Sequence, residues 1–400
     1  MGVVVTTTVS LLIVAIIVAL IARRLAFPYT VGLVITGIGL ALTRHDMDVV
    51  LTHEFIFDVI LPPLIFEAAI NLHWKELRRD ALPILTLALF GTIISAGVVA
   101  TGMVFGLNWP VAPALLFGVL IAATDPVAVI AMFKDNGIEG RLRLLVESES
   151  LFNDGVAAVL FSLVLASILT IHGQAITATE AARTLLFTVG GGIFIGIACA
   201  GAAIALAGRT SDHLIASTLT TIAAYGSFLL AEHFHFSGVL ATLAAGLLIG
   251  NLTILRDRED TRVSQRGREF VLALWEFIAF IANSLIFLLI GLTVAGIPFD
   301  RFGGVAFVIV IALVLLGRAL GVYPLCLLFV RSRWAIPVSD QHVLWWGGLR
   351  GALGLALSLS LPPSLPFRNE ILIATFGVVA FSVILQGLTM PPLLRRASKS

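Results

Sequence analysis

Long runs of apolar residues recur along the whole chain, and short polar connections separate them. Each run has about the 20 residues that a helix needs to cross roughly 30 Å of hydrocarbon. Membrane-spanning strands would instead alternate polar and apolar residues over short segments. The pattern therefore predicts an all-α polytopic membrane protein with about thirteen transmembrane helices, at residues 4–22, 27–43, 55–72, 82–106, 112–133, 143–171, 182–208, 213–231, 236–252, 269–297, 302–330, 340–361 and 369–393.

The basic residues of the connections agree with this count, because lysine and arginine collect on the cytoplasmic side of membrane proteins. Nineteen of them lie after odd-numbered helices or in the C-terminal tail, and four lie after even-numbered helices. This bias predicts a multi-pass protein of the cell membrane with its N-terminus outside and its C-terminus in the cytoplasm. Two further arginines, Arg318 and Arg350, fall inside predicted helices.

The composition supports this class, since 59% of the 400 residues are hydrophobic and 12% are charged. Soluble domains carry about 25% charged residues. We therefore expect one transmembrane domain over residues 1–400, surrounded by membrane lipid and without a soluble regulatory domain. The net charge of +1 gives no indication of nucleic acid binding, and no P-loop motif for a nucleotide is present. Ion gradients are thus the expected source of energy for any transport.

The thirteen helices can be divided into two six-helix repeats, at about 4–171 and 213–393, joined by a linker helix at about 182–208. An offset of seven helices gives the repeats opposite orientations, as in many secondary transporters. The corresponding fifth and twelfth helices are both interrupted, by Thr124-Asp125-Pro126 and by Gly347-Gly348-Leu349-Arg350-Gly351. Either interruption alone could be an ordinary proline or glycine kink, but the pair predicts broken helices at a binding site.

Charged and polar residues gather near the middle of these helices. A rise of about 1.5 Å per residue places Asp125 and Asp154 near the membrane midplane, where isolated charge is costly. On the sixth helix, Ser150 and Asp154 share one face, and Glu149 and Asn153 share an adjoining face. Carboxylate, hydroxyl and carbonyl oxygens suit Na⁺, Li⁺ or K⁺ better than a transition metal. The sequence therefore predicts a site for an alkali cation.

Two buried ion pairs follow from matching depths in the membrane. Arg318 is expected near the level of Glu149, and Arg350 near the level of Glu67. A buried charge is far less costly when it is paired with an opposite one. We therefore predict the pairs Glu149–Arg318 and Glu67–Arg350.

Several motifs together resemble those of the monovalent cation/proton antiporter family, in the branch of prokaryotic Na⁺/H⁺ antiporters and animal sodium/proton exchangers. The resemblance covers nearly the whole chain, in order. It rests on the two interruptions above, on Arg318 before Tyr323-Pro324, and on Leu61-Pro62-Pro63-Leu64-Ile65-Phe66-Glu67, Glu149-Ser150-Leu151-Phe152-Asn153-Asp154 and Phe236-Ser237-Gly238-Val239-Leu240-Ala241.

The resemblance implies roles for individual residues. Asp154 would bind the cation and the proton in turn. Ser150, the backbone carbonyl of Thr124 and Glu149 would complete the Na⁺ shell. Asp125 and Asn153 would hold the crossed broken helices and the site together.

The resemblance also implies a secondary antiporter that exchanges Na⁺ (or Li⁺) for H⁺ by alternating access, with neither enzymatic activity nor a cofactor. Asn153 before Asp154 resembles the electroneutral branch, because the electrogenic branch usually has two adjacent aspartates. A homodimer is implied, with Glu67–Arg350 bridging a moving core and a dimerisation domain. Since the chain stops soon after the last helix, no regulatory tail is expected.

The sequence also allows other functions. K⁺/H⁺ exchange is the main alternative, and a cation channel or an intramembrane aspartyl protease using Asp125 and Asp154 are remote ones. Glu232-His233-Phe234-His235 is expected to form a polar cluster at the membrane boundary. Gly190-Gly191-Gly192 is expected to allow close helix packing.

Overall fold

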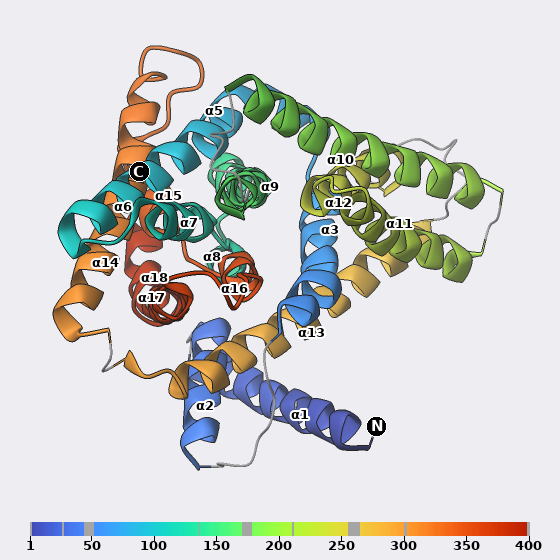
Figure 1. Ribbon diagram of the computed structural model, residues 1–400. Coiled ribbons are helices and arrows are strands. Elements are labelled where there is room, and N and C mark those ends of the chain that lie inside the picture. The colour runs from blue at the N-terminus through green and yellow to red at the C-terminus, as the bar shows by residue number, and fades with distance from the viewer. Residues whose placement is uncertain are drawn as a thin grey trace. The chain divides into compact units, whose positions relative to one another are not determined.

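The computed structural model of the protein describes residues 2–25, 28–43, 52–135, 137–169, 178–209, 212–254, 265–299 and 302–397, and within these ranges it contains helices and no β-strand (Figure 1). Every one of the thirteen predicted segments coincides with a helix or with a run of consecutive helices. The all-α prediction is therefore confirmed. The charged connection expected around 256–268 lies mostly outside the described residues.

In the described part of the chain, eight helices are long and apolar enough to cross a membrane, by length and composition. Three shorter apolar helices are found at Val9–Ala22, Tyr29–Thr43 and Gly238–Ile254. The two remaining predicted segments, 55–72 and 340–361, are built from shorter consecutive helices.

The chain divides into two compact units, and each takes segments from both predicted repeats. The first unit comprises Met1–Ile56, Pro83–Asn153 and Asn283–Ser400, and the second comprises Phe57–Leu82 and Asp154–Ala282. The assignment of the repeats themselves stays a prediction.

The first unit is built around the interrupted helices. Its helices are α1 (Gly2–Leu25), α2 (Tyr29–Thr43), the π-helix η2 (Leu87–Gly91), α6 (Thr92–Leu107), α7 (Val111–Ala122), α8 (Val127–Asp135), the first half of α9 (Arg141–Leu169), the end of α13 (Gln265–Ala295), α14 (Gly304–Leu327), α15 (Val338–Trp346), α16 (Ala352–Leu359), α17 (Arg368–Phe381), the π-helix η5 (Ser382–Gln386) and α18 (Gly387–Ala397). Short α5 (Ala81–Thr86) leads into this unit.

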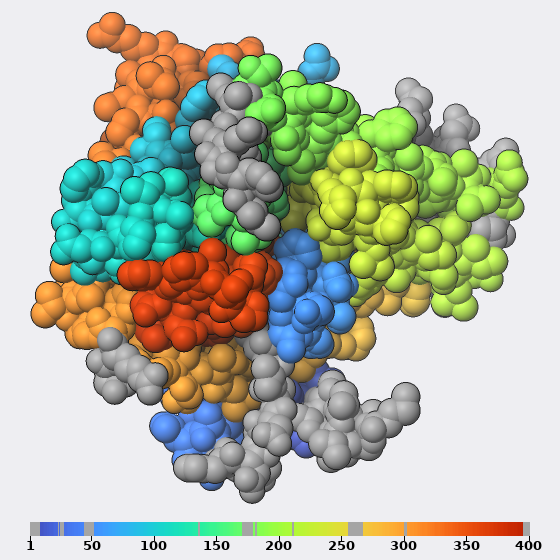
Figure 2. All heavy atoms as spheres, in the orientation of Figure 1, coloured from blue at the N-terminus to red at the C-terminus, as the bar shows by residue number. Residues whose placement is uncertain are grey.

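Small residues let the helices of this unit approach closely. A Cβ added to Gly317 of α14 would lie 2.9 Å from the carbonyl oxygen of Ser95 of α6. Helix α7 contacts α6, α16 and α17, and Figure 2 shows the teal spheres of the α6–α7 region against the red spheres of the C-terminal helices. The contact between α7 and α16 brings the ends of the two interrupted helices next to each other.

Both predicted interruptions are confirmed. The fifth predicted helix consists of α7, which ends at Ala122, and α8, which begins at Val127. The twelfth consists of α15, which ends at Trp346, and α16, which begins at Ala352. Proline at position 126 cannot donate a backbone hydrogen bond, and the glycines at 347–351 favour irregular backbone, so both breaks have a local cause.

The second unit contains the π-helix η1 (Phe55–Ile60), α3 (Leu61–Asn71), α4 (Trp74–Arg79), the second half of α9, α10 (Ala178–Ala207), α11 (His213–His233), α12 (Gly238–Ile249), the π-helix η3 (Gly250–Ile254) and most of α13. Its core surrounds Trp275, whose indole N–H donates to Thr220 Oγ1 over 3.0 Å. Helices α3 and α12 pack closely, since a Cβ on Gly246 would lie 2.7 Å from that of Ala69.

Candidate functional site

Asp125 holds the two interrupted helices together where they cross. Its backbone N–H donates to the carbonyl oxygen of Leu349 over 2.7 Å. Its carboxylate accepts the backbone N–H of Val127 over 3.0 Å and also that of Ala352. One carboxylate thus caps the N-termini of both α8 and α16, where the unpaired N–H groups and the helix dipole favour negative charge.

A glycine is needed beside this carboxylate. A Cβ added to Gly351 would collide with the side chain of Asp125. The twelfth predicted helix therefore carries glycine here to admit the carboxylate between the two chain segments.

Arg350 binds the other helix end at the first interruption, where α7 stops. Its Nη1 donates to the carbonyl oxygens of Ala122 and Ala123 over 2.8 and 3.1 Å, at the C-terminus of α7. Its backbone N–H donates to Ser382 Oγ over 2.9 Å. A cation at a helix C-terminus binds the unpaired carbonyls and complements the dipole. The break consequently has a carboxylate at one helix end and a guanidinium at the other.

Glu149 of α9 and Arg318 of α14 form a buried, two-bond ion pair. Nη1–Oε1 and Nη2–Oε2 are both 2.7 Å apart, and the two residues are 1% and 6% exposed. Arg318 Nη2 also donates to the carbonyl oxygen of Leu344 over 3.0 Å, near the end of α15. Bidentate geometry of this kind is the strongest arrangement for such a pair, and it connects α9 to the interrupted helix.

Three neutral side chains meet beside the first interruption. Thr124 Oγ1 donates to Ser150 Oγ over 3.0 Å, and Ser150 Oγ donates to the carbonyl oxygen of Thr124 over 2.5 Å. Asn153 Nδ2 donates to Thr124 Oγ1 and to the carbonyl oxygen of Ala122, over 3.1 and 3.2 Å. Thr124, Ser150 and Asn153 are all buried. The network joins α9 to the broken end of α7.

Thr92 completes this network, and sequence reasoning did not single it out. Its hydroxyl lies 2.7 Å from Asn153 Oδ1 and 2.5 Å from the carbonyl oxygen of Ala88. The residue follows the π-helix η2, and single π turns inside helices are frequent at functional sites. The sequence offered only a single threonine within a long apolar helix, which does not show what its side chain contacts. Ser382, whose Oγ accepts the backbone N–H of Arg350, was likewise a single hydroxyl in an apolar segment and was not predicted.

Asp154 follows Asn153 directly along α9 and stands one turn after Ser150, on the same helix face. It is partly buried and belongs by its contacts to the second unit. Glu67 also belongs to the second unit, where its Oε1 accepts from Asn71 Nδ2 over 3.0 Å. The predicted Glu67–Arg350 pair joins the two units and stays a prediction.

The geometry of the first unit, with two crossed broken helices in a polytopic helical domain and buried charges at their ends, defines the class of secondary transporters. The sequence profile of the sodium/hydrogen exchanger transmembrane family matches residues 9–396. The chain therefore belongs to the sodium/hydrogen exchanger family, as the motifs predicted.

Individual relatives agree with this membership. The Na⁺/H⁺ antiporter ApNhaP of Aphanothece halophytica is 39% identical over 92% of this chain and 69% of its own length. The Na⁺/H⁺ antiporter NhaH of Halobacillus aidingensis is 32% identical over 96% of both chains. The structure of the sodium proton antiporter MjNhaP1 from Methanocaldococcus jannaschii superposes with a TM-score of 0.76 at 19% identity, over 99% of both chains. This last likeness establishes the fold.

Proposed function

We propose that the protein is an antiporter that exchanges Na⁺ or Li⁺ for H⁺ across the cell membrane by alternating access. Membership of the sodium/hydrogen exchanger family and relatives named Na⁺/H⁺ antiporters support this function. The observation that carries it is the buried neutral network of Thr124, Ser150 and Asn153 at a helix break, directly before Asp154 in α9.

Asp154 is the proposed exchanging group. Its carboxylate binds either one Na⁺ or one proton, and the two exclude each other. Ser150 Oγ and the carbonyl oxygen of Thr124 are the proposed additional ligands. They now share the Ser150 hydrogen, so Na⁺ binding would turn that hydroxyl to present its lone pairs to the ion.

Glu149, unlike Ser150 and Thr124, is already occupied by an ion pair. Both of its oxygens accept hydrogen bonds from Arg318, so direct Na⁺ ligation by Glu149 requires this pair to open. Asp125 and Asn153 are proposed to fix the geometry, since Asp125 caps both half-helices and Asn153 binds Thr124.

Coupling follows from the cost of moving charge through the membrane interior. An empty Asp154 carboxylate leaves a buried net charge, which opposes movement of the site. Either occupant neutralises it. Exchange of one Na⁺ for one H⁺ moves no net charge, so we propose electroneutral exchange. We also propose that the working assembly is a homodimer and that the C-terminus lies in the cytoplasm.

Proteoliposomes test this function. We expect wild-type protein to dissipate an imposed pH gradient on addition of Na⁺ or Li⁺, with saturation, and at the same rate whether or not the membrane potential is clamped. Asp154→Asn is expected to fall to background, whereas Glu269→Gln, which alters an exposed carboxylate, retains the parent rate.

Each other outcome is informative. Undiminished exchange by Asp154→Asn contradicts the proposed site. A response to K⁺ alone indicates K⁺/H⁺ exchange, and flux that does not saturate or move protons indicates a channel.

A further inference from the structure

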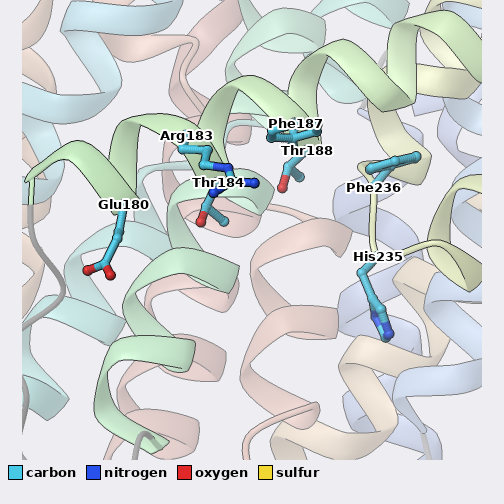
Figure 3. Close-up of a pocket in the computed structure, with 7 residues that line it drawn as sticks. All are labelled: Glu180, Arg183, Thr184, Phe187, Thr188, His235 and Phe236. Atoms are coloured by element: carbon cyan, nitrogen blue, oxygen red, sulfur yellow. The ribbon is translucent and has the colours of Figure 1, made fainter.

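The second unit carries a pocket of about 370 Å³ that the proposed ion exchange does not use. Figure 3 shows its walls: one side is the start of α10, and the other is the connection between α11 and α12. The lining residues are Glu180, Arg183, Thr184, Phe187, Thr188, His235 and Phe236. Charged and hydroxyl groups therefore face a shared space with two aromatic rings.

The pocket has a fixed wall. The backbone N–H of Ser237 donates to the carbonyl oxygen of Thr188 over 3.2 Å, which ties the connection to α10. A Cβ on Gly191 would lie 2.5 Å from the Phe236 ring, and one on Gly192 would lie 2.6 Å from the Ser237 carbonyl oxygen. Gly191 and Gly192 thus allow the close packing predicted for the glycine run, whereas a Cβ on Gly190 would meet nothing within 4 Å.

His235 is held in an unusual conformation at the rim. Its φ of 58° lies in the left-handed region, which is unfavourable for a residue other than glycine. The surrounding hydrogen bonds maintain it: its backbone N–H donates to the Glu232 carbonyl oxygen over 3.0 Å, and Glu232 Oε1 accepts the N–H of Gly238 over 2.8 Å. The imidazole is exposed at the pocket.

Helix length places this pocket at the level of lipid headgroups. Helix α10 has 30 residues, which span about 45 Å, whereas the hydrocarbon core is about 30 Å thick. The apolar part that could cross a membrane begins at Ala182. Glu180 and Arg183 consequently lie at the boundary between the polar and the apolar layers.

Apolar side chains continue from the pocket along α10. The exposed fractions are 71% for Leu186, 59% for Phe187, 73% for Phe194 and 49% for Ile197. A ligand with a polar end at the pocket and long apolar chains would cover these side chains. A phospholipid has this division, and a soluble metabolite does not.

The charges select among phospholipids. Arg183 lies over the Phe187 ring at 5.5 Å, near the N-terminus of α10, where the helix dipole also favours a phosphate. The hydroxyls of Thr184 and Thr188 and the imidazole of His235 can donate to phosphate oxygens. Glu180, one turn before Arg183, disfavours a headgroup of net negative charge and suits an ammonium.

We propose that this pocket binds one phospholipid with a primary-amine headgroup, such as phosphatidylethanolamine. Its phosphate binds Arg183 and His235, its ammonium binds Glu180, and its acyl chains lie along the exposed apolar residues of α10. The site is separate from the proposed ion exchange, and the orientation that the charge bias of the sequence predicts would put it in the outer leaflet.

Binding to the delipidated full-length protein in detergent tests the proposal. The probes are phosphatidylethanolamine, phosphatidylglycerol and water-soluble glycerophosphoethanolamine, and the readouts are native mass spectrometry and the shift in Tm. We expect phosphatidylethanolamine to bind about tenfold more tightly than phosphatidylglycerol, the effect of roughly one favourable charge contact. Glycerophosphoethanolamine should give no comparable shift.

Matched variants separate this site from general lipid adsorption. Arg183→Gln removes a contact with the phosphate that both lipids carry, so it should weaken the binding of phosphatidylethanolamine about tenfold. Arg209→Gln, which alters an exposed arginine just after the other end of α10, should retain the parent affinity. Glu180→Gln should shift the preference towards phosphatidylglycerol. All three positions are exposed, so the variants are expected to fold, which their Tm without lipid checks.

Three results would overturn the proposal. Equal binding by Arg183→Gln and Arg209→Gln shows that the pocket is not the lipid site. Equal affinity for glycerophosphoethanolamine and the lipid shows that the ligand is soluble. A dimer fraction that changes in Arg183→Gln with unchanged lipid binding shows that the pocket is covered by a second copy of the chain.

Discussion

The hydroxyl of Thr92 lies 2.7 Å from the side-chain oxygen of Asn153. This contact fixes which end of the Asn153 amide faces Thr124, because the oxygen is turned to Thr92 and the nitrogen donates to Thr124 Oγ1. The orientation of the proposed ion site thus depends on a residue of α6 that touches no proposed ligand of Na⁺.

Replacing Thr92 with valine tests this dependence. Thr92→Val keeps the shape of the side chain and removes the donor, and a buried partner left unsatisfied costs about 1–3 kcal/mol. In proteoliposomes we expect an apparent KM for Na⁺ raised roughly tenfold, with a smaller effect on the maximal rate. Thr92→Ser, which keeps the hydroxyl, should stay near the parent value. An equal loss in both variants would indicate that shape, and not the hydrogen bond, is what matters.

The buried pair Glu149–Arg318 predicts a characteristic stability cycle. Removing one partner leaves an uncompensated buried charge, at a cost of about 3–5 kcal/mol. Glu149→Gln and Arg318→Gln should each lower Tm strongly. The double variant should recover much of that loss, because no buried charge is then left alone. Thermal unfolding in detergent measures all four proteins, and additive losses would rule out the coupling.

A third prediction concerns the contact between Gly351 and Asp125. Gly351→Ala places a Cβ against the carboxylate that caps both half-helices, so transport and Tm should both fall. Gly190→Ala is the matched control, since a Cβ there meets nothing within 4 Å. It lies inside α10, where alanine is favoured over glycine by up to about 1 kcal/mol. Its Tm should stay or rise, and a decrease like that of Gly351→Ala would remove the steric explanation.

Competition at Asp154 predicts how Na⁺ dependence changes with pH. As pH falls, more of the carboxyl is protonated and less is available to Na⁺, so the apparent KM for Na⁺ rises. Where the protonated form dominates, each decrease of one pH unit should raise the apparent KM for Na⁺ about tenfold, and the maximal rate should stay constant. Initial rates over a grid of pH and Na⁺ concentration measure this. A KM independent of pH would show that the two ions do not share one site.

Local sequence features were sufficient for several parts of the fold. Proline at 126 and the glycines at 347–351 act on their own backbone, so both helix breaks could be predicted from the chain alone. The short helix α4 and the π-helical turns could not be, because their boundaries depend on how neighbouring helices pack. The apolar runs predicted where helices lie, and not how each is rotated about its axis.

The sequence by itself determined the class of the protein, its helical segments, the two interruptions and the family, because each of these depends on the order and chemistry of neighbouring residues. Only the tertiary structure decided which groups meet. Thr92 and Asn153 are 61 residues apart, and Arg350 is 228 residues from the Ala122 carbonyl that it binds. The lipid pocket likewise needs the start of α10 beside the connection between α11 and α12. Such contacts depend on the packing and rotation of whole helices, which no local pattern specifies.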